Sequence, residues 1–264
     1  RGGTWVREAV VKQPPVARVT PRRGGGRARG PSPADLAAAS PADAVRAWAR
    51  LGYPRRALAL HAAAVAITER HGGVVPDTID ELKALPGVGD YTARAVAVFS
   101  HGQRHPVVDI NVRRVLARAV DGEGMPGPAS TRRDLEAMDA ALPRDLADSL
   151  VTNAAVMELG ALVCTARAPR CDVCPIAALC AWRARGYPDY VGPRTPTQKR
   201  FEGSDRQVRG LILAELRQSD VPVAATEIEG VWAADEQRDR ALAGLLRDGL
   251  VTGSPAAGYT LPGD

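Results

Sequence analysis

The chain has 264 residues, and 45% of them are hydrophobic, which is enough to bury the core of one large domain or of two to three small ones. Its formal net charge is +5, a basic balance that is compatible with a polyanionic partner. Neither a secretory signal nor an apolar run of membrane length is visible in the sequence. A reducing cytoplasm is therefore the default expectation, with no membrane partner.

Apolar residues at helical spacing dominate the chain and alternating strand patterns are almost absent, so the sequence predicts an all-α fold. The first thirty residues hold eight Lys/Arg and one acid, Glu8, and residues 20–31 are so rich in Gly and Arg that we expect a flexible loop. Ser40 followed by Pro41 is typical of a helix start, and this helix is predicted to reach Leu51. The same patterns predict further helices over 54–70, 78–85, 91–100, 130–142 and 146–163, and one that follows Asp109.

The end of the chain differs in character. Residues 186–203 are polar and contain proline, so they are predicted to be a linker. Beyond them the sequence predicts a winged-helix-like module, with a small helical appendage as the alternative. Its elements would be helices over 204–218, 223–231 and 235–249 and a hairpin that pairs 250–252 with 259–261.

All the cysteines lie in one short window, with the spacing C-x6-C-x2-C-x5-C. Four thiolates gathered in this way can hold a [4Fe–4S] cluster or a structural Zn²⁺. Paired CxxC motifs would favour zinc, and only one is present, so the spacing favours the cluster. Disulfides are the third alternative, but a chain with an ample core does not need them. The candidate ligands are Cys164, Cys171, Cys174 and Cys180.

A glycine hairpin, Leu85-Pro86-Gly87-Val88-Gly89, joins two predicted helices. Gly87 and Gly89 can adopt backbone angles that other residues avoid, and they leave room for a phosphate backbone to approach. Backbone N–H groups at the start of the next helix suit a phosphate oxygen. The alternative is an ordinary glycine turn between helices.

Asp109 follows an apolar segment and precedes the next predicted helix. One interpretation is an N-cap, which stabilises a helix by about 0.5–2 kcal/mol. The other is a carboxylate that the helix N-terminus keeps ionised and that stabilises a developing sugar cation in a cleft. From the sequence alone, the N-cap interpretation of Asp109 is favoured over the catalytic one.

These features together resemble the helix–hairpin–helix DNA glycosylases that carry a C-terminal iron–sulfur cluster, and within them the adenine DNA glycosylases that act on adenine opposite 8-oxoguanine. The resemblance covers roughly residues 4–185. It rests on four segments: Trp5 to Glu8 with Gln13 and Val16; Leu51 to Tyr53 with Arg55 to Leu58; Leu85 to Thr92 with Val108 to Asn111; and Met157 to Ala161, which leads into the cysteines.

The resemblance implies a six-helix-barrel domain and a [4Fe–4S] cluster domain, to which the sequence adds the winged-helix-like extension. It also implies a monomer that binds double-stranded DNA containing a mismatch or an oxidised guanine, at the nucleoid of a bacterial cytoplasm. The expected divisions are a catalytic-Glu segment, altered or truncated relative to the family, over 1–19; the six-helix barrel with the hairpin over 32–120; the cluster domain over 121–185; the linker over 186–203; and the module over 204–264.

The resemblance further assigns roles to single residues. Glu8 matches the general acid that protonates the adenine ring, and Asp109 matches the carboxylate that stabilises the oxocarbenium-like sugar, so that one group carries a proton while the other stays charged. Tyr91 stands where the bifunctional relatives carry a Schiff-base lysine, so no lyase cleavage of the strand is expected. The expected DNA contacts are the wedge Tyr53, the space-filling Gln13, the hairpin residues Leu85, Gly87, Val88 and Gly89, and Asn111 and Arg113.

Two features leave other functions open. Tyr91 also resembles the thymine/uracil mismatch glycosylases, which makes G·T or G·U pairs alternative substrates. Pro14 and Pro15 stand where the family continues the helix that carries the acid, and proline inside a helix costs about 3 kcal/mol. A catalytically impaired DNA-binding or damage-sensing homologue is therefore the second alternative. The Trp-Val-x-Glu setting of Glu8 favours adenine.

Overall fold

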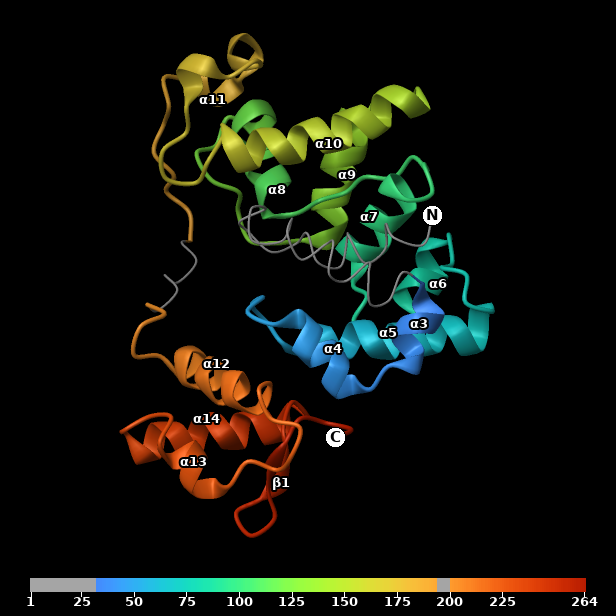
Figure 1. Ribbon diagram of the computed structural model, residues 1–264. Helices are drawn as coiled ribbons and strands as arrows, with labels where there is room; N and C mark the ends of the chain where they lie inside the picture. The colour runs from blue at the N-terminus through green and yellow to red at the C-terminus, as the bar shows by residue number, and fades with distance from the viewer. Residues whose placement is uncertain (1–31, 194–199) are drawn as a thin grey trace. The chain divides into compact units, whose positions relative to one another are not determined.

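The computed structural model describes residues 32–193 and 200–264, and these fold into helices with a single two-stranded hairpin (Figure 1). The predicted all-α class is confirmed. The described residues form two compact units, one built from 32–76, 81–88 and 200–264 and the other from 77–80 and 89–193. No helix within the described ranges is long and apolar enough to cross a membrane.

The first unit begins with three helices, α3 (Pro33–Ala38), α4 (Pro41–Trp48) and α5 (Arg55–His71). Ser40 caps α4 as predicted, and it forms a capping box with Asp43. Gly72 ends α5 at φ 59°, a left-handed conformation that suits glycine. The sequence did not predict α3, because six residues are too few to show a helical period.

The C-terminal elements of the same unit are α12 (Asp205–Leu216), α13 (Ala225–Glu229), α14 (Asp235–Arg247), β1 (Thr252–Ser254) and β2 (Gly258–Thr260). The strands pair antiparallel with Thr252 opposite Thr260. The first strand starts two residues later than predicted, because Leu250 and Val251 are buried in the core and take no part in the ladder.

One hydrophobic core joins these C-terminal elements to α4 and α5. The side chains from 204–264 therefore share a core with the start of the described chain. That core contains Val45, Trp48, Leu51 and Ala57 from the early helices and Val208, Ile212, Leu213, Leu216, Ile228, Leu245, Leu250, Tyr259 and Leu261 from the C-terminal elements.

After α5 in the chain comes α6 (Ile79–Lys83). The second unit contains α7 (Asp90–Phe99), α8 (Ile110–Leu116), α9 (Thr131–Ala141) and α10 (Leu146–Leu162), and α8 packs against both α9 and α10 (Figure 1). A π-helical turn, Ala117–Asp121, extends α8 and ends at Gly122. After α10 come two short 3₁₀ turns, Cys171–Val173 and Ala177–Leu179, and then α11 (Ala181–Ala184).

The close packing of α8 on α10 depends on Gly160. A Cβ at this position would lie 2.8 Å from the Asn111 carbonyl oxygen and 2.8 Å from its Cβ. The missing side chain lets the two backbones approach, and that approach brings the start of α8 to the end of α10, where the cysteine loop begins.

Candidate functional site

The hairpin of residues 85–89 is a tight turn anchored by its first residue. Leu85 is buried, and the Val88 N–H donates to the Leu85 carbonyl at 3.2 Å. Gly87 has φ 72°, and a Cβ there would lie 2.5 Å from the Ala59 Cβ, so both the conformation and the space require glycine. Gly89 precedes α7 and offers no capping side chain, and nothing lies within 4 Å of where its Cβ would be. The turn thus leaves open space at the N-terminus of α7.

Asp109 caps α8, so the N-cap interpretation is confirmed. Its Oδ1 accepts from the backbone N–H groups of Asn111 and Val112, both at 2.8 Å. Its Oδ2 accepts from the Asn111 side-chain amide at 3.0 Å. Three N–H donors therefore hold the carboxylate at the helix N-terminus, in the setting that favours a negative charge.

The segment that leads to Asp109 is held by a buried amide. Asn153 in α10 has no exposed surface, and its Oδ1 accepts from the Val107 N–H at 2.9 Å. Its Nδ2 donates to the His105 carbonyl at 3.1 Å. Because this single side chain binds the extended segment through two backbone groups, it fixes the path of the chain into Asp109.

Arg114 connects the Asp109 cap to the cysteine loop. This arginine is only 7% exposed, and it donates to the side-chain oxygen of Asn111 at 2.8 Å, to the Gly160 carbonyl at 2.6 Å and to the Cys164 carbonyl at 2.7 Å. Burial lowers the pKa of its guanidinium, and neighbouring Arg118 lowers it further, whereas Cys164 and Asp109 raise it. A continuous chain of hydrogen bonds thus runs from Cys164 through Arg114 and Asn111 to Asp109.

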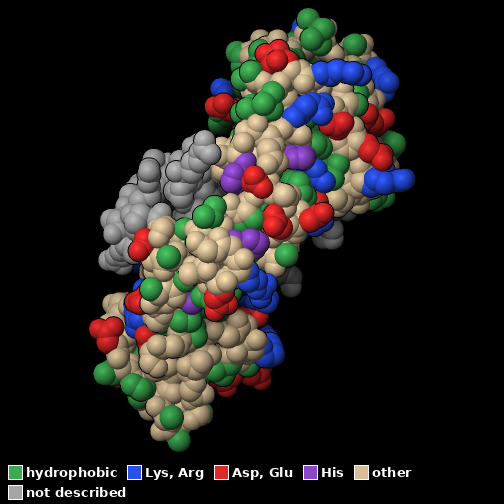
Figure 2. All heavy atoms as spheres, turned by 90° about the vertical axis from the view of Figure 1, so that its right-hand side faces the viewer, with side chains coloured by type: hydrophobic (Ala, Val, Ile, Leu, Met, Phe, Trp, Pro, Cys, Tyr) green, Lys and Arg blue, Asp and Glu red, His purple; other side chains and the backbone are tan. Residues whose placement is uncertain are grey.

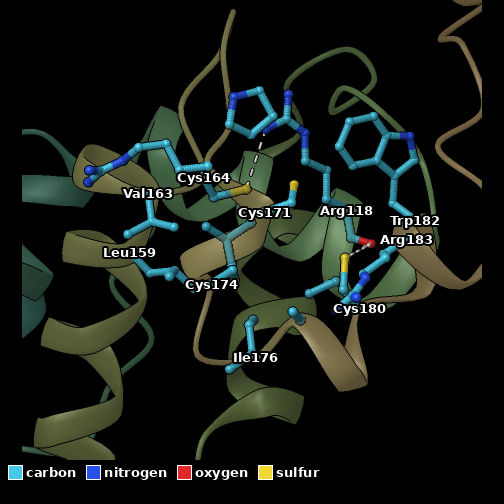
Figure 3. A pocket seen from close by; sticks show the side chains of 15 residues that line it. Arg118, Leu159, Val163, Cys164, Cys171, Cys174, Ile176, Cys180, Trp182 and Arg183 are labelled. Atoms are coloured by element: carbon cyan, nitrogen blue, oxygen red, sulfur yellow. Dashed lines mark hydrogen bonds between the residues drawn. The ribbon is translucent and has the colours of Figure 1, made fainter.

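All four cysteines line one pocket and none forms a disulfide, as Figure 3 shows. Arg118 from the π-helical turn lies beside them, with its guanidinium 3.4 Å from the Cys164 Sγ and 4.7 Å from the ring centroid of Trp182. Among the residues that the structure describes, no three His, Cys, Asp or Glu side chains converge on a point that would hold a single ion. A four-iron cluster instead takes one thiolate at each of four separate irons.

The chemistry of the cysteine set fits such a cluster. Burial raises the pKa of the Cys171 thiol most, a hydrogen bond from Tyr187 lowers it, and the charges of the other three cysteines raise it. Four neighbouring thiolates therefore need a positive centre among them, and coordination to iron supplies it.

The other predicted site residues are distributed over both units. Tyr53 is 68% exposed in the loop between α4 and α5, with φ 55°. Tyr91 is half-buried in the first turn of α7 and packs beside the core of Ala95, Val98 and Val107. The guanidinium of Arg113 lies 2.8 Å from the Asp134 carboxylate and also donates to the Gly127 carbonyl. Glu8 and Gln13 lie outside the described residues.

Sequence reasoning missed Arg114 and Asn153. The signal for Arg114 was a second cation, directly after Arg113, next to the apolar Val115 and Leu116 of α8. Asn153 was an amide in the middle of the mostly apolar α10. Buried polar side chains at such positions point to hydrogen-bond partners elsewhere in the fold.

Two families of known proteins match parts of this chain. The helix-hairpin-helix motif matches residues 70–99, from the end of α5 through the hairpin to the end of α7. The iron-sulfur binding domain of endonuclease III matches residues 164–180, the window that contains all four cysteines. The predicted [4Fe–4S] cofactor is thereby confirmed.

Relatives extend over almost the whole chain. A protein named adenine DNA glycosylase from Mycobacterium tuberculosis (strain ATCC 25618 / H37Rv) is 50% identical over 261 residues, which cover 98% of this chain and 84% of the relative. The protein of that name from Homo sapiens is 39% identical over 187 residues, 69% of this chain and 33% of the relative. A thymine/uracil-DNA glycosylase from Pyrobaculum aerophilum is 36% identical over 151 residues, 56% of this chain and 66% of the relative.

Solved structures share the fold at lower identity. A thermostable thymine-DNA glycosylase has a TM-score of 0.61 at 22% identity, over 69% of this chain and 84% of that structure. Endonuclease III trapped as a covalent intermediate with DNA also has a TM-score of 0.61 at 22% identity, over 71% of this chain and 87% of that structure. The predicted helix–hairpin–helix glycosylase fold is therefore confirmed.

Proposed function

Because this chain belongs to the family of adenine DNA glycosylases, we propose that it is a monofunctional DNA N-glycosylase of base-excision repair. Its substrate is adenine mispaired with 8-oxoguanine or guanine in double-stranded DNA, and the reaction hydrolyses the N-glycosidic bond. The observation that carries the proposal is 50% identity over 98% of the chain to a protein of that name. We also propose that the protein acts as a monomer at the bacterial nucleoid.

The chemistry divides between two carboxylic groups. Glu8 protonates the adenine ring, so that the base leaves more readily when the bond to the sugar breaks. Asp109 stabilises the positive charge that develops on the sugar. Water then adds to the sugar carbon, and its surplus proton returns to the Glu8 carboxylate. The three N–H donors on Asp109 support this role because they hold the carboxylate in one orientation before the substrate binds.

DNA binding involves the hairpin and the exposed tyrosine. The base must leave the helical stack to reach the carboxylic groups, and a mismatched base costs less to extrude. Tyr53 inserts beside the lesion, and Gln13 fills space near the vacated position. We further propose that Leu85, Gly87, Val88, Gly89, Asn111 and Arg113 contact or position the DNA strand, and that Tyr91, which lacks an amine nucleophile, leaves the strand uncleaved.

The cofactor has a separate part in the protein. We assign Cys164, Cys171, Cys174 and Cys180 as the ligands of the [4Fe–4S] cluster, which when bound supplies a crosslink between the ends of a loop. Arg114 and Arg118 attach this loop to α8 and to the π-helical turn through the Cys164 carbonyl and the Cys164 Sγ. No step of the base excision uses the cluster.

A panel of duplexes tests the function. Adenine opposite 8-oxoguanine, adenine opposite guanine, and thymine or uracil opposite guanine are incubated with the protein and then treated with alkali, which breaks the strand at abasic sites. We expect breaks only in the first two duplexes and none without alkali. Breakage of the thymine or uracil duplexes alone would refute the proposed substrate.

A G·T or G·U mismatch glycosylase is the second candidate, because Tyr91 and the 36% identity to a thymine/uracil-DNA glycosylase both favour it. The third is an impaired homologue that binds DNA without excision, which Pro14 and Pro15 near Glu8 favour. Binding to every duplex with no excision from any of them would support this third function.

A further inference from the structure

The loop between α4 and α5 holds an unusual backbone conformation. Ala49 has φ 49° and Tyr53 has φ 55°, so two residues with a Cβ lie in the left-handed region within one short loop. Each such residue costs on the order of 1–3 kcal/mol, and it persists only where the surrounding structure holds it. The Tyr53 ring is nevertheless 68% exposed, so its own side chain does not supply that support.

Trp48, the last residue of α4, binds the backbone of this loop. Its indole Nε1–H donates to the Gly52 carbonyl at 3.1 Å, directly before Tyr53. Its ring is only 4% exposed, and the Arg56 guanidinium lies 5.7 Å from the ring centroid. Trp48 thus links a buried position to the backbone of the residue that precedes the exposed tyrosine.

The support under Trp48 comes from residues 204–264. Trp48 belongs to the same hydrophobic core as α12, α14 and the end of the chain. Beside it in α4, Arg46 makes a two-pronged ion pair with the Asp264 carboxylate at 2.8 and 2.7 Å, and the Val45 carbonyl accepts from Arg217 at 3.2 Å. The C-terminal elements therefore bind the helix that ends at Trp48 through side chains and backbone.

The C-terminal elements also contact the other end of the loop, where α5 begins. The Asp248 carboxylate, at the C-terminal end of α14, lies 3.5 Å from the guanidinium of Arg55, the first residue of α5. Its other partner is Arg209 of α12, at 2.5 Å. Residues on both sides of Tyr53 are thus tied to residues 204–264.

The charge of this part of the chain does not suit DNA. Residues 204–264 carry six Lys/Arg and ten Asp/Glu, a formal net charge of −4. The helix that a winged-helix module would present to DNA is α14, and it begins with Asp235 and Glu236. The net charge of −4 and the acids at the start of α14 therefore disfavour phosphate contacts by this part of the chain.

We propose that residues 204–264 are a positioning element for the Tyr53 loop, with Trp48 and Asp248 as the positioning residues. The C-terminal elements hold Trp48 and Arg55, Trp48 holds the Gly52 carbonyl, and Tyr53 is presented to DNA in its left-handed conformation. This inference rests on the proposed function, in which Tyr53 inserts beside the mismatch.

The test measures how well the full chain with its cluster distinguishes two duplexes. One contains 2′-fluoro-2′-deoxyadenosine opposite 8-oxoguanine, because the fluorine blocks excision, and the other is fully matched. The ratio of the two dissociation constants is the readout. Trp48→Phe keeps an aromatic ring in the core but removes the N–H, and losing one hydrogen bond should lower the ratio about three- to tenfold.

Trp232→Phe is the matched control. Trp232 packs against the same core, and its Nε1–H donates to the Gln237 side chain at 2.8 Å and not to a backbone carbonyl of the loop. We expect Trp232→Phe to keep the ratio of the wild type. An equal fall in both variants would mean that the core as a whole, and not the Gly52 contact, sets the ratio, and would overturn the inference.

A double variant separates positioning from stability. Tyr53→Ala should lower the ratio, and adding Trp48→Phe to it should lower the ratio no further, because Trp48 acts through Tyr53. An additive fall would overturn the inference. If Trp48→Phe does not fold, the same ratio of dissociation constants is measured for Asp248→Ala. A ratio at least twofold below that of the wild type supports the proposal, and an unchanged ratio overturns it.

The binding ratios of the wild type and of Trp48→Phe distinguish a wrong substrate from a wrong positioning role. If the wild-type protein binds both duplexes equally, the proposed function is wrong and the role of Tyr53 falls with it. If the wild type distinguishes them and Trp48→Phe does so equally well, the function stands and the positioning role is wrong.

Discussion

Asp109 combines a structural and a proposed catalytic role in one side chain, and a single substitution separates them. Asparagine caps helices about as well as aspartate, so Asp109→Asn should change the free energy of unfolding by less than about 1 kcal/mol. It removes the negative charge, and loss of one such electrostatic contact slows a reaction by about 10²–10³-fold. Single-turnover excision of adenine opposite 8-oxoguanine measures this effect. Excision at the wild-type rate would show that Asp109 is a cap only.

Arg114 should matter for stability, because it donates to the buried Gly160 carbonyl, to the partly buried Cys164 carbonyl and to the side-chain oxygen of Asn111. Arg114→Leu leaves these acceptors without a donor, which should cost about 1–3 kcal/mol of the free energy of unfolding. Urea denaturation measures that cost, and the rate at which the visible absorbance of the cluster fades measures loosening of the cysteine loop. The control is Arg133→Leu, which removes one bond from an exposed side chain to the Pro128 carbonyl and should change little. Equal effects of the two variants would contradict the role of Arg114.

Among single residues, the sequence predicts the roles of those whose evidence lies in the neighbouring sequence. Asp109 stands directly before the helix that it caps, and the cysteines lie within one window. Arg114 and Asn153 were not predictable, because their partners lie 46 to 50 residues away in the chain. Sequence spacing carries no information about such contacts until the helices are packed.

Substitution of two helical glycines, one in a tight contact between helices and one facing open space, should have opposite effects on stability. Gly160→Ala places a methyl group 2.8 Å from the Asn111 backbone oxygen, and such overpacking costs about 1–3 kcal/mol. Gly210 in α12 has nothing within 4 Å, so Gly210→Ala should stabilise the protein by about 0.5–1 kcal/mol through helix propensity. The midpoints of thermal and urea denaturation measure both. Stabilisation by Gly160→Ala would show that the two helices separate easily.

The elements themselves were largely predictable, because helix starts and ends have local signals. Ser40 with Pro41 and the glycine at 72 fixed the ends of two helices to within a few residues. The hairpin was misplaced by two residues at its first strand, because Leu250 is buried in a core whose other residues, in α4 and α12, are distant in the sequence. The π-helical turn that carries Arg118 was not predicted, because the period of the apolar residues does not reveal it.

On the scale of the whole chain, charge is divided unevenly. The formal net charge of +5 comprises +9 on residues 1–203 and −4 on residues 204–264. On the face in Figure 2, Lys/Arg and Asp/Glu side chains are mixed, without a broad patch of one sign. Composition revealed the basic excess but not that the C-terminal elements share a core with α4 and α5, because that core joins residues about 150 to 220 positions apart.

Salt dependence tests the binding that this charge distribution favours. If phosphate contacts come from the basic part of the chain, raising monovalent salt from about 50 to about 200 mM should weaken duplex binding by at least about tenfold, since each contact releases counterions. The double variant Asp235→Asn, Glu236→Gln removes both negative charges at the start of α14. It should leave the slope of log Kd against log salt unchanged, because the start of α14 lies outside the proposed DNA contacts. The melting temperature over the same salt range shows whether the protein remains folded. A flat slope in the wild type would contradict phosphate binding by the hairpin, and a changed slope in the double variant would place α14 against DNA, contrary to a purely positioning role for residues 204–264.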